Sequence, residues 1–331
     1  MTTYKGINGF AVQSVASDPS PLNEGQVWYN NATYAFKLAA VTTSGTWAAG
    51  GNLNTARAGS GGSKAGTQTA VIVYGGTLGP SYSSATESYN GSSWTTQPGS
   101  LNTSRASLSG FGTQTAALAF GGLNPVNAIQ SATESYNGTS WTTVNSLNTG
   151  RYDISSSGFG IQTAGILAGG NLPGVSAATE SWNGTSWTSV NSLNTSRFQN
   201  ASAGIQTAGI TFGGQTPSVS SAIESWDGTS WTTSPATLPT AVGYQGSFGT
   251  QTAAVTAGGL TTVAVGTTYL WNGTSISTNP NSLATARYNL PGAGTQTDGL
   301  IIGGTNGASN LANTEEFTGP GVAQTKTITT S

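Results

Sequence analysis

The chain has 331 residues, of which only 6% are charged, and a formal net charge of −2 with no cluster of basic residues. Nucleic-acid-binding proteins carry a basic patch, so this composition argues against a nucleic-acid partner. The absence of Cys and His excludes disulfides, thiolate and imidazole metal sites, and hydrolytic sites that use a His base.

The first 50 residues contain short strand-like runs. We predict three strands here, over 9–15, 25–29 and 33–38. Trp47 stands ten residues before Arg57, which is the spacing between Trp141 and Arg151 later in the chain. Trp47 therefore marks a further strand, of the kind that ends each later repeat. The opening residues have no apolar core, so we expect no signal peptide.

From residue 51 onward the chain repeats a unit of about 45 residues. A glycine pair recurs at intervals of 46, 48, 44, 45 and 45 residues, beginning at Gly75-Gly76. In the unit 105–147 we predict an innermost strand A within 106–111, then strand B within 115–122, strand C over 132–136 and strand D over 140–144. Asn137-Gly138 predicts a hairpin with a type I′ turn, which requires positive φ at both central residues.

Short strands repeated at this period are typical of a β-propeller, in which each repeat is one blade. We predict an all-β fold of four-stranded antiparallel blades in a single domain over 1–331, with six repeats over 51–331. Seven blades is the preferred count, because 331 divided by a period of about 46 gives about 7, and residues 1–50 then form a degenerate N-terminal blade. The alternative is six blades, with the strand of Trp47 closing the last blade and residues 1–40 forming an attachment segment.

Half of the charged residues fall at two positions of the repeat. The arginines are Arg57, Arg105, Arg151, Arg197 and Arg287, and the glutamates are Glu87, Glu134, Glu180, Glu224 and Glu315. The fifth repeat has Val242 and Tyr269 instead, so both charges are lost together. A lone buried charge is costly, whereas loss of both partners is close to neutral. We therefore predict structural Arg–Glu pairs; the alternative is a ligand-binding role for the arginines.

The loops between strands B and C differ most between repeats. They share a face with the segments between strand D and the next strand A, because alternate connections of a four-stranded blade emerge together. Aromatic side chains beside amides and hydroxyls suit a glycan, and loops on a rigid scaffold commonly carry function. The candidate ligand-binding residues on this face are Tyr82, Asn124, Asn127, Tyr152, Phe198, Tyr244, Tyr288 and Asn306.

The repeat resembles the kelch repeat. The glycine pair Gly121-Gly122, then Tyr136, then Trp141 five residues later, and Arg151 opening the next unit carry this resemblance, which covers about residues 50–318. The recurring phrases GTQTA and YNGTSW are similar to those of kelch-like structural proteins of tailed phages, particularly marine ones. That second resemblance implies a virion protein, in a tail fibre or on the head. The copper-dependent sugar oxidation of one kelch branch requires His and a Cys-linked Tyr, which this chain lacks.

Enzymatic activity is not expected. A glycosidase needs two convergent carboxylates, and the acids outside the Glu repeat, such as Asp153 and Asp298, lie in different repeats. We expect no cofactor, no metal and no membrane insertion, although a calcium site built from backbone and Asp oxygens stays open.

The expected function is a non-enzymatic virion protein of the tail-fibre or tailspike type, which recognises a host-surface glycan or protein through its B–C loop face. The expected partners also include other virion proteins, reached through the N-terminal segment, and further copies of the chain in a homo-oligomer. The alternatives are a head or tail decoration or spacer protein without a receptor and, less favoured, a polysaccharide-cleaving enzyme.

Overall fold

The computed structural model describes residues 12–41, 44–321 and 323–328, and the regular structure in these residues consists of β-strands. The predicted all-β class is confirmed. The chain divides into two compact units, one formed by Trp47–Phe317 and the other by Met1–Thr46 with Thr318–Ser331, rather than the single domain that we expected. Among the described residues there is no helix long and apolar enough to span a lipid bilayer.

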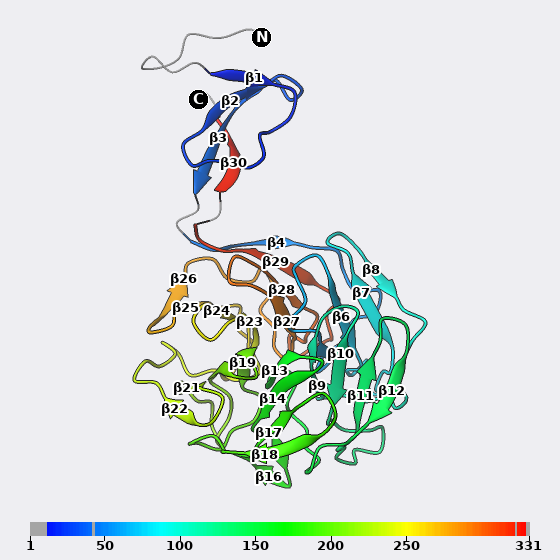
Figure 1. Ribbon diagram of the computed structural model, residues 1–331. Helices are drawn as coiled ribbons and strands as arrows, with labels where there is room; N and C mark the ends of the chain where they lie inside the picture. The colour runs from blue at the N-terminus through cyan, green and yellow to red at the C-terminus, as the bar shows by residue number, and fades with distance from the viewer. Residues whose placement is uncertain (1–11, 42–43, 322, 329–331) are drawn as a thin grey trace. The chain divides into compact units, whose positions relative to one another are not determined.

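The unit Trp47–Phe317 is a β-propeller of six four-stranded blades (Figure 1). The innermost strands A are β5 (Gly61–Gly62), β9 (Ser109–Gly112), β13 (Gly158–Ile161), β19 (Ala201–Ile205), β23 (Gly246–Gly249) and β27 (Gly292–Gly294). Strands B are β6 (Val71–Tyr74), β10 (Ala117–Phe120), β14 (Ala164–Ala168), β20 (Ala208–Phe212), β24 (Ala254–Ala257) and β28 (Asp298–Ile302).

Strands C and D complete the blades on the outside. Strands C are β7 (Thr86–Tyr89), β11 (Thr133–Tyr136), β17 (Thr179–Trp182), β21 (Ile223–Trp226), β25 (Thr268–Trp271) and β29 (Thr314–Thr318). Strands D are β8 (Trp94–Thr96), β12 (Trp141–Val144), β18 (Trp187–Val190), β22 (Trp231–Thr233), β26 (Ile276–Asn279) and, in blade six, β4 (Thr46–Ala49). A short extra hairpin, β15 (Asn171–Leu172) with β16 (Gly174–Val175), lies in the B–C loop of blade three.

Backbone hydrogen bonds link each blade to the next and close the ring between blades six and one. The second glycine of each pair donates its N–H to the carbonyl at the Arg position of the following blade, over 2.7–3.0 Å. Gly304 of blade six donates in this way to Arg57 of blade one. Gln68 adds a second link across the same junction, because its Nε2 donates to the carbonyls of Gly299 and Phe317. Six blades therefore complete the ring.

Strand β4 shows how the last blade is completed. It lies next to β29, and Trp47 on it donates Nε1–H to Oγ1 of Thr268 in blade five over 2.9 Å. Trp141 on β12 makes the same bond to Thr86 of the preceding blade. Seven four-stranded sheets occur among the described residues, but the seventh belongs to the other compact unit. The preferred count of seven blades is thus corrected to the alternative of six.

The smaller unit contains that seventh sheet, in the strand order β1-β2-β3-β30. Its strands are β1 (Gln13–Val15), β2 (Val27–Asn30), β3 (Ala35–Val41) and β30 (Ala323–Thr327). The strands predicted near 9–15, 25–29 and 33–38 are present, except that residues 9–11 lie outside the described residues. They do not form a blade of the ring: β1 pairs parallel with β2, and β30 from the other end of the chain pairs with β3.

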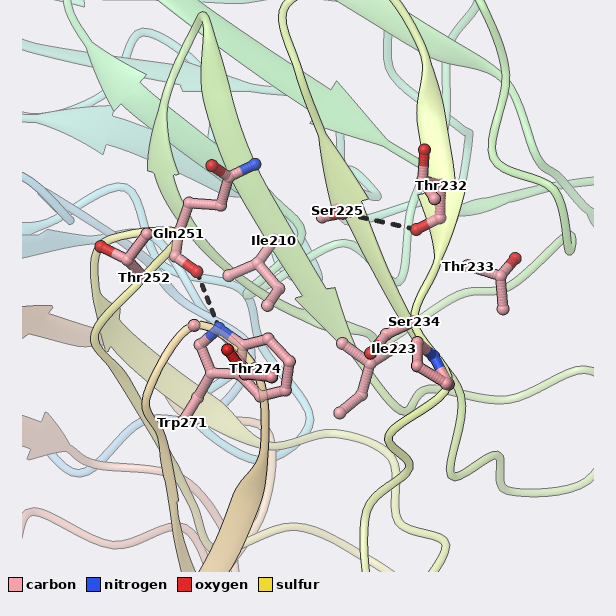
Figure 2. A pocket seen from close by; sticks show the side chains of 12 residues that line it. Ile210, Ile223, Ser225, Thr232, Thr233, Ser234, Gln251, Thr252, Trp271 and Thr274 are labelled. Atoms are coloured by element: carbon pink, nitrogen blue, oxygen red, sulfur yellow. Dashed lines mark hydrogen bonds between the residues drawn. The ribbon is translucent and has the colours of Figure 1, made fainter.

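Aromatic pairs fill the outer part of the blades. In blade two, Tyr136 on strand C and Trp141 on strand D have ring centroids 4.9 Å apart, and both are buried. Blade five differs, because Ile276 replaces the strand-D tryptophan opposite Trp271. Figure 2 shows Trp271 facing Ile210 and Ile223 of blade four across a pocket.

The C–D connections are hairpins, but the predicted type I′ turn is wrong. Tyr136 pairs with Trp141, so the loop has four residues, of which Gly138 has a φ of 95° while Asn137 keeps a negative φ. The side chain of Asn137 explains the difference, because its Oδ1 accepts the backbone N–H groups of Thr139 and Ser140. The asparagine therefore holds the loop through its side chain rather than through a left-handed backbone.

Candidate functional site

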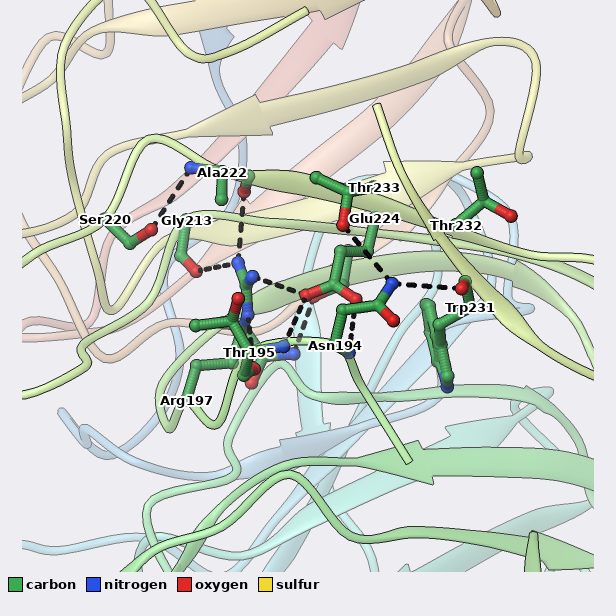
Figure 3. A network of polar contacts seen from close by, with 12 residues as sticks. Asn194, Thr195, Arg197, Gly213, Ser220, Ala222, Glu224, Trp231, Thr232 and Thr233 are labelled. Atoms are coloured by element: carbon green, nitrogen blue, oxygen red, sulfur yellow. Dashed lines mark hydrogen bonds and ion pairs between the residues drawn. The ribbon is translucent and has the colours of Figure 1, made fainter. Parts of the chain in front are cut away.

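The five predicted Arg–Glu pairs are present and buried. Arg197 lies just before the innermost strand of blade four, and its Nη2 is 2.6 Å from Oε1 of Glu224 on strand C of the same blade. Figure 3 shows that Nη1 also donates to the carbonyls of Gly213 and Ala222. The second carboxylate oxygen of Glu224 accepts the backbone N–H of Asn194 over 2.7 Å.

These contacts give the arginines a structural role rather than a ligand-binding one. Burial lowers the pKa of Arg197, and the charge of Glu224 opposes that shift. A buried pair persists because its remaining donors and acceptors are also satisfied. Each pair joins the segment before strand A to strand C of the same blade, so the pairs stabilise single blades. The links between blades come from other contacts, among them those of the glycine pairs and of Gln68.

The fifth repeat loses three interacting groups at once. Val242 and Tyr269 replace the Arg and the Glu, and Pro239 replaces the residue whose backbone N–H binds the carboxylate in other repeats. Proline has no N–H to donate. With both donors gone, a buried carboxylate here would be unpaired, and the buried Tyr269 avoids that cost.

The variable loops and the D–A segments lie on one face of the propeller, as predicted. In blade six, Tyr288 of the D–A segment and Thr305 of the B–C loop exchange two backbone hydrogen bonds of 2.9 Å. Isolated bridges join the equivalent residues of the other five blades. The loops that differ most between repeats are therefore held against the segments that lead into the innermost strands.

Aromatic side chains from three successive blades meet on this face. The ring of Tyr244 stands edge-on to Phe198 at 6.3 Å and to Tyr288 at 5.8 Å. All three are half-buried, as is Tyr152 of blade three. Burial raises the pKa of Tyr244 to about 12, with smaller contributions from Asp153, Tyr288 and Tyr152. Three of the predicted aromatic residues thus contact one another, and Tyr152 lies near enough to influence the Tyr244 hydroxyl. We call these four residues the mouth cluster: Tyr152, Phe198, Tyr244 and Tyr288.

The other predicted ligand-binding residues lie in the B–C loops. Oδ1 of Asn124 accepts the N–H groups of Val126 and Ala128, and Oδ1 of Asn306 likewise accepts two N–H groups of its own loop. Their amide oxygens therefore shape the loops. Tyr82 donates its hydroxyl to Oδ1 of Asn127 over 2.7 Å, which joins the B–C loops of blades one and two.

A ring of left-handed residues surrounds the axis beside the mouth cluster. Its members, one from each blade, are Gly59, Ser107, Asp153, Gln199, Tyr244 and Asn289, with φ between 52° and 61°. At four of the junctions, the backbone N–H of one member donates to the carbonyl of the member in the preceding blade, over 2.8–3.0 Å. The donors are Gln199, Tyr244, Asn289 and Gly59. Five of the six are not glycine, and a positive φ is unfavourable for them. The hydrogen bonds help to hold four of these five, Asp153, Gln199, Tyr244 and Asn289, in this conformation.

Four polar side chains of this axial ring were not among the predicted ligand-binding residues: Ser107, Asp153, Gln199 and Asn289. Asp153 accepts a hydrogen bond of 3.0 Å from Nε2 of Gln199. Oδ1 of Asn289 is buried and has no hydrogen-bond partner among the described residues.

Asp153 makes the stability of the propeller depend on pH. Burial raises its pKa above the ordinary 3.8, against the hydrogen bonds from Gln199, Asn171 and Ser107. The folded state therefore keeps a proton that the unfolded chain has lost, and stability decreases as pH rises through that range. We expect Asp153→Asn to raise the melting temperature at pH 7, and to raise it less at pH 3, in thermal unfolding experiments. Asp298→Asn, at an exposed carboxylate, is the control; equal effects of the two variants would contradict the prediction.

A buried lysine crosses the axis, and sequence reasoning missed it. Lys64 is 8% exposed, and its Nζ donates to the carbonyls of Ser156 and Ser202 over 2.6 Å and to Oγ of Ser247 over 3.1 Å. Lys64 belongs to blade one, whereas these three partners belong to blades three, four and five, so its side chain spans the central channel. Burial lowers its pKa to about 7. The lysine also borders a cavity of about 190 Å³ on the A–B side.

The sequence carries a signal for this lysine. Nine residues separate Arg57 from Gly66 of the A–B connection, whereas seven separate Arg105 from Gly112. Only the first and third repeats have the longer spacing, and the extra residues include Lys64 and Ser156. The change in spacing near the innermost strand thus indicated where the side chain of Lys64 enters the central channel.

Comparison with known proteins leaves the family open: no family model matches the chain, and neither does any curated protein. Among the described residues, no group of three or more His, Cys, Asp or Glu side chains could hold a metal ion.

Proposed function

We propose that this protein is a non-enzymatic component of a phage particle, of the tail-fibre or tailspike type, which recognises a host-surface glycan or protein. The face that carries the B–C loops is the recognition surface, and the mouth cluster with the axial ring is its centre. The proposal rests on one observation above all: aromatic rings from successive blades converge where the loops that vary between repeats are held.

The chemistry of the mouth fits a sugar or a polar side chain. Tyr244 and Tyr288 offer apolar ring surface together with their phenol hydroxyl groups. Ligand sites commonly combine such apolar walls with a few polar groups that fix orientation. The rigid ring beneath them reduces the entropy lost when a ligand binds.

The assignment to a virion rests on the kelch-like repeat and on its recurring phrases, which are similar to those of phage structural proteins. The compact unit formed by residues 1–46 and 318–331 is the proposed attachment to other virion proteins. A decoration or spacer role is the second candidate, supported by the use of the Asn124 and Asn306 amides within their own loops.

Binding to host cells tests the proposal. We expect the purified protein to bind the cells saturably and to compete with infection. Tyr288→Ala should weaken this binding about tenfold or more, because central aromatic residues dominate many interfaces. Ile205→Ala, at the exposed last residue of strand β19, is the matched control and should bind normally. No saturable binding, together with antibody labelling over the whole particle head, would favour the decoration role instead.

A further inference from the structure

Five of the six blades pack the strand-C aromatic ring against a strand-D tryptophan, with the two rings tilted by 32–51°. The centroids of these pairs are 4.8–5.3 Å apart. Each of these tryptophans also donates its Nε1–H to a threonine Oγ1 on strand C of the preceding blade, over 2.9–3.1 Å. The propeller therefore contains the same slot five times, and an indole ring from the chain fills each copy.

The junction of blades four and five lacks both members of this contact. Ile276 stands in place of the strand-D tryptophan, and Ile223 stands in place of the threonine that accepts its hydrogen bond. Trp271 on strand C is still present, and its Nε1–H still donates to the carbonyl of Gln251 over 2.7 Å. Within Trp47–Phe317, which the structure describes throughout, Trp271 is thus the strand-C ring without a tryptophan beside it on strand D. Its aromatic neighbour is Phe212 of blade four, which stands edge-on at 6.1 Å.

A cavity of about 330 Å³ lies at this junction. Figure 2 shows Ile210 and Ile223 on one side of it and Trp271 with Thr274 on the other. The hydroxyl-bearing residues Ser225, Thr232 and Thr233 lie along its border. Cavities that hold small ligands start at about 300 Å³ and combine apolar walls with a few polar groups.

We propose that this cavity, which we call the blade-five slot, binds a small molecule that carries a planar aromatic ring of indole size. The five filled slots of the same propeller provide the template, since in each of them an indole lies against the strand-C ring. Stacked and edge-to-face aromatic pairs are stabilised beyond the area that they bury. The bound ring takes the place of the missing tryptophan beside Trp271.

The walls of the slot favour an aromatic ring over a sugar. The change from threonine to Ile223 removes the hydroxyl that would accept a hydrogen bond deep in the slot, and Ile210 adds a second apolar surface. A sugar would bury hydroxyl groups there without partners, which is costly. The hydroxyls at the border are placed to contact a polar edge of the ring. The slot is separate from the mouth cluster, so its ligand is distinct from the proposed receptor.

Nuclear magnetic resonance of the full chain with free indole tests this inference. The Nε1–H signal of Trp271, assigned by its loss in Trp271→Phe, should shift saturably with a dissociation constant on the order of 1 mM, a weak affinity suited to a nine-atom ring. Methyl glucoside at the same concentration should leave this signal in place. The double variant Ile276→Trp with Ile223→Thr rebuilds the contact of the other blades, and should weaken indole binding at least about tenfold.

The result is decisive in either direction. Failure of indole to shift the Trp271 signal, an equal shift in the double variant, or a shift with methyl glucoside instead would overturn the proposal. Should the double variant not fold, mapping on the unmodified protein decides: shifts confined to Trp271 and the methyl groups of Ile210 and Ile223 support the slot, and shifts spread elsewhere refute it.

Discussion

Replacing Arg151 with alanine is expected to destabilise the propeller by about 3–5 kcal/mol, the range for breaking a buried ion pair. The variant leaves Glu180 buried without its cation. It also removes the donor that reaches the carbonyls of Gly169 and Ala178. A loss of this size should lower the melting temperature by roughly 10 °C, which calorimetry or circular dichroism can measure.

The fifth repeat supplies the matched control. It replaces the same three groups together, with Pro239, Val242 and Tyr269. We therefore expect the triple variant Asn148→Pro, Arg151→Val and Glu180→Tyr to be more stable than Arg151→Val alone, because no charge is left unpaired in the blade. A loss from Arg151→Ala of less than about 0.5 kcal/mol, typical of surface substitutions, would contradict a structural role for the pair.

The blades were predictable because most of their turns and buried contacts recur from repeat to repeat. Strand B, for example, was expected within 115–122 and is Ala117–Phe120. The Arg–Glu pairs were predictable for a similar reason, since one repeat loses both charges and so reveals that they interact. Repetition supplies within one chain the comparison that would otherwise need several sequences.

The number of blades was not predicted correctly, because Trp47 fits both arrangements equally well. The deciding signal lay in what residues 1–46 lack. They contain neither a glycine pair nor the Gly-x-Gln-Thr phrase, and these are the residues that bond to the neighbouring blades, as Gly304 and Gln68 do at the closing junction. Strands without such links cannot take a place in the ring.

Within the candidate site, side-chain placement could only be predicted in part. The mouth cluster was expected because its residues follow the Arg position of each repeat. Asn124 and Asn306 were expected to face a ligand, but their oxygens bind their own loops, a use that depends on the local backbone conformation. The loss of Trp at Ile276 was visible, whereas its coupling to Ile223 depends on a contact between different blades.

Raising the pH from 7 to 9 is expected to stabilise the propeller through Lys64. Burial lowers the pKa of this lysine to about 7 from an ordinary 10.5. Between these two values the unfolded chain binds a proton that the folded protein has released, so stability increases with pH. Between pH 7 and pH 9 the free energy of unfolding is therefore expected to increase by about 2 kcal/mol. Below pH 7 both states are protonated and the dependence on this lysine disappears.

The composition of the chain makes this effect easy to isolate. It contains no His and no Cys, which are the side chains that ordinarily titrate between pH 6 and 9. A neutral amine can still donate two of the three hydrogen bonds that Lys64 makes to Ser156, Ser202 and Ser247. The side chain of Lys64 therefore still crosses the channel after it loses its proton. The increase in stability comes from removing a charge from the protein interior.

Chemical unfolding of the wild type and of Lys64→Met at pH 7, 8 and 9 measures the effect. Methionine keeps a long unbranched side chain in the channel but carries no titratable group. We expect the unfolding free energy of the wild type to increase over this interval and that of Lys64→Met to stay flat. Lys37→Met removes a lysine from strand β3 in the smaller unit and should retain the increase. A wild-type profile as flat as that of Lys64→Met would mean that the three oxygen acceptors keep the amine protonated, and that the axis of this propeller holds a permanent buried cation.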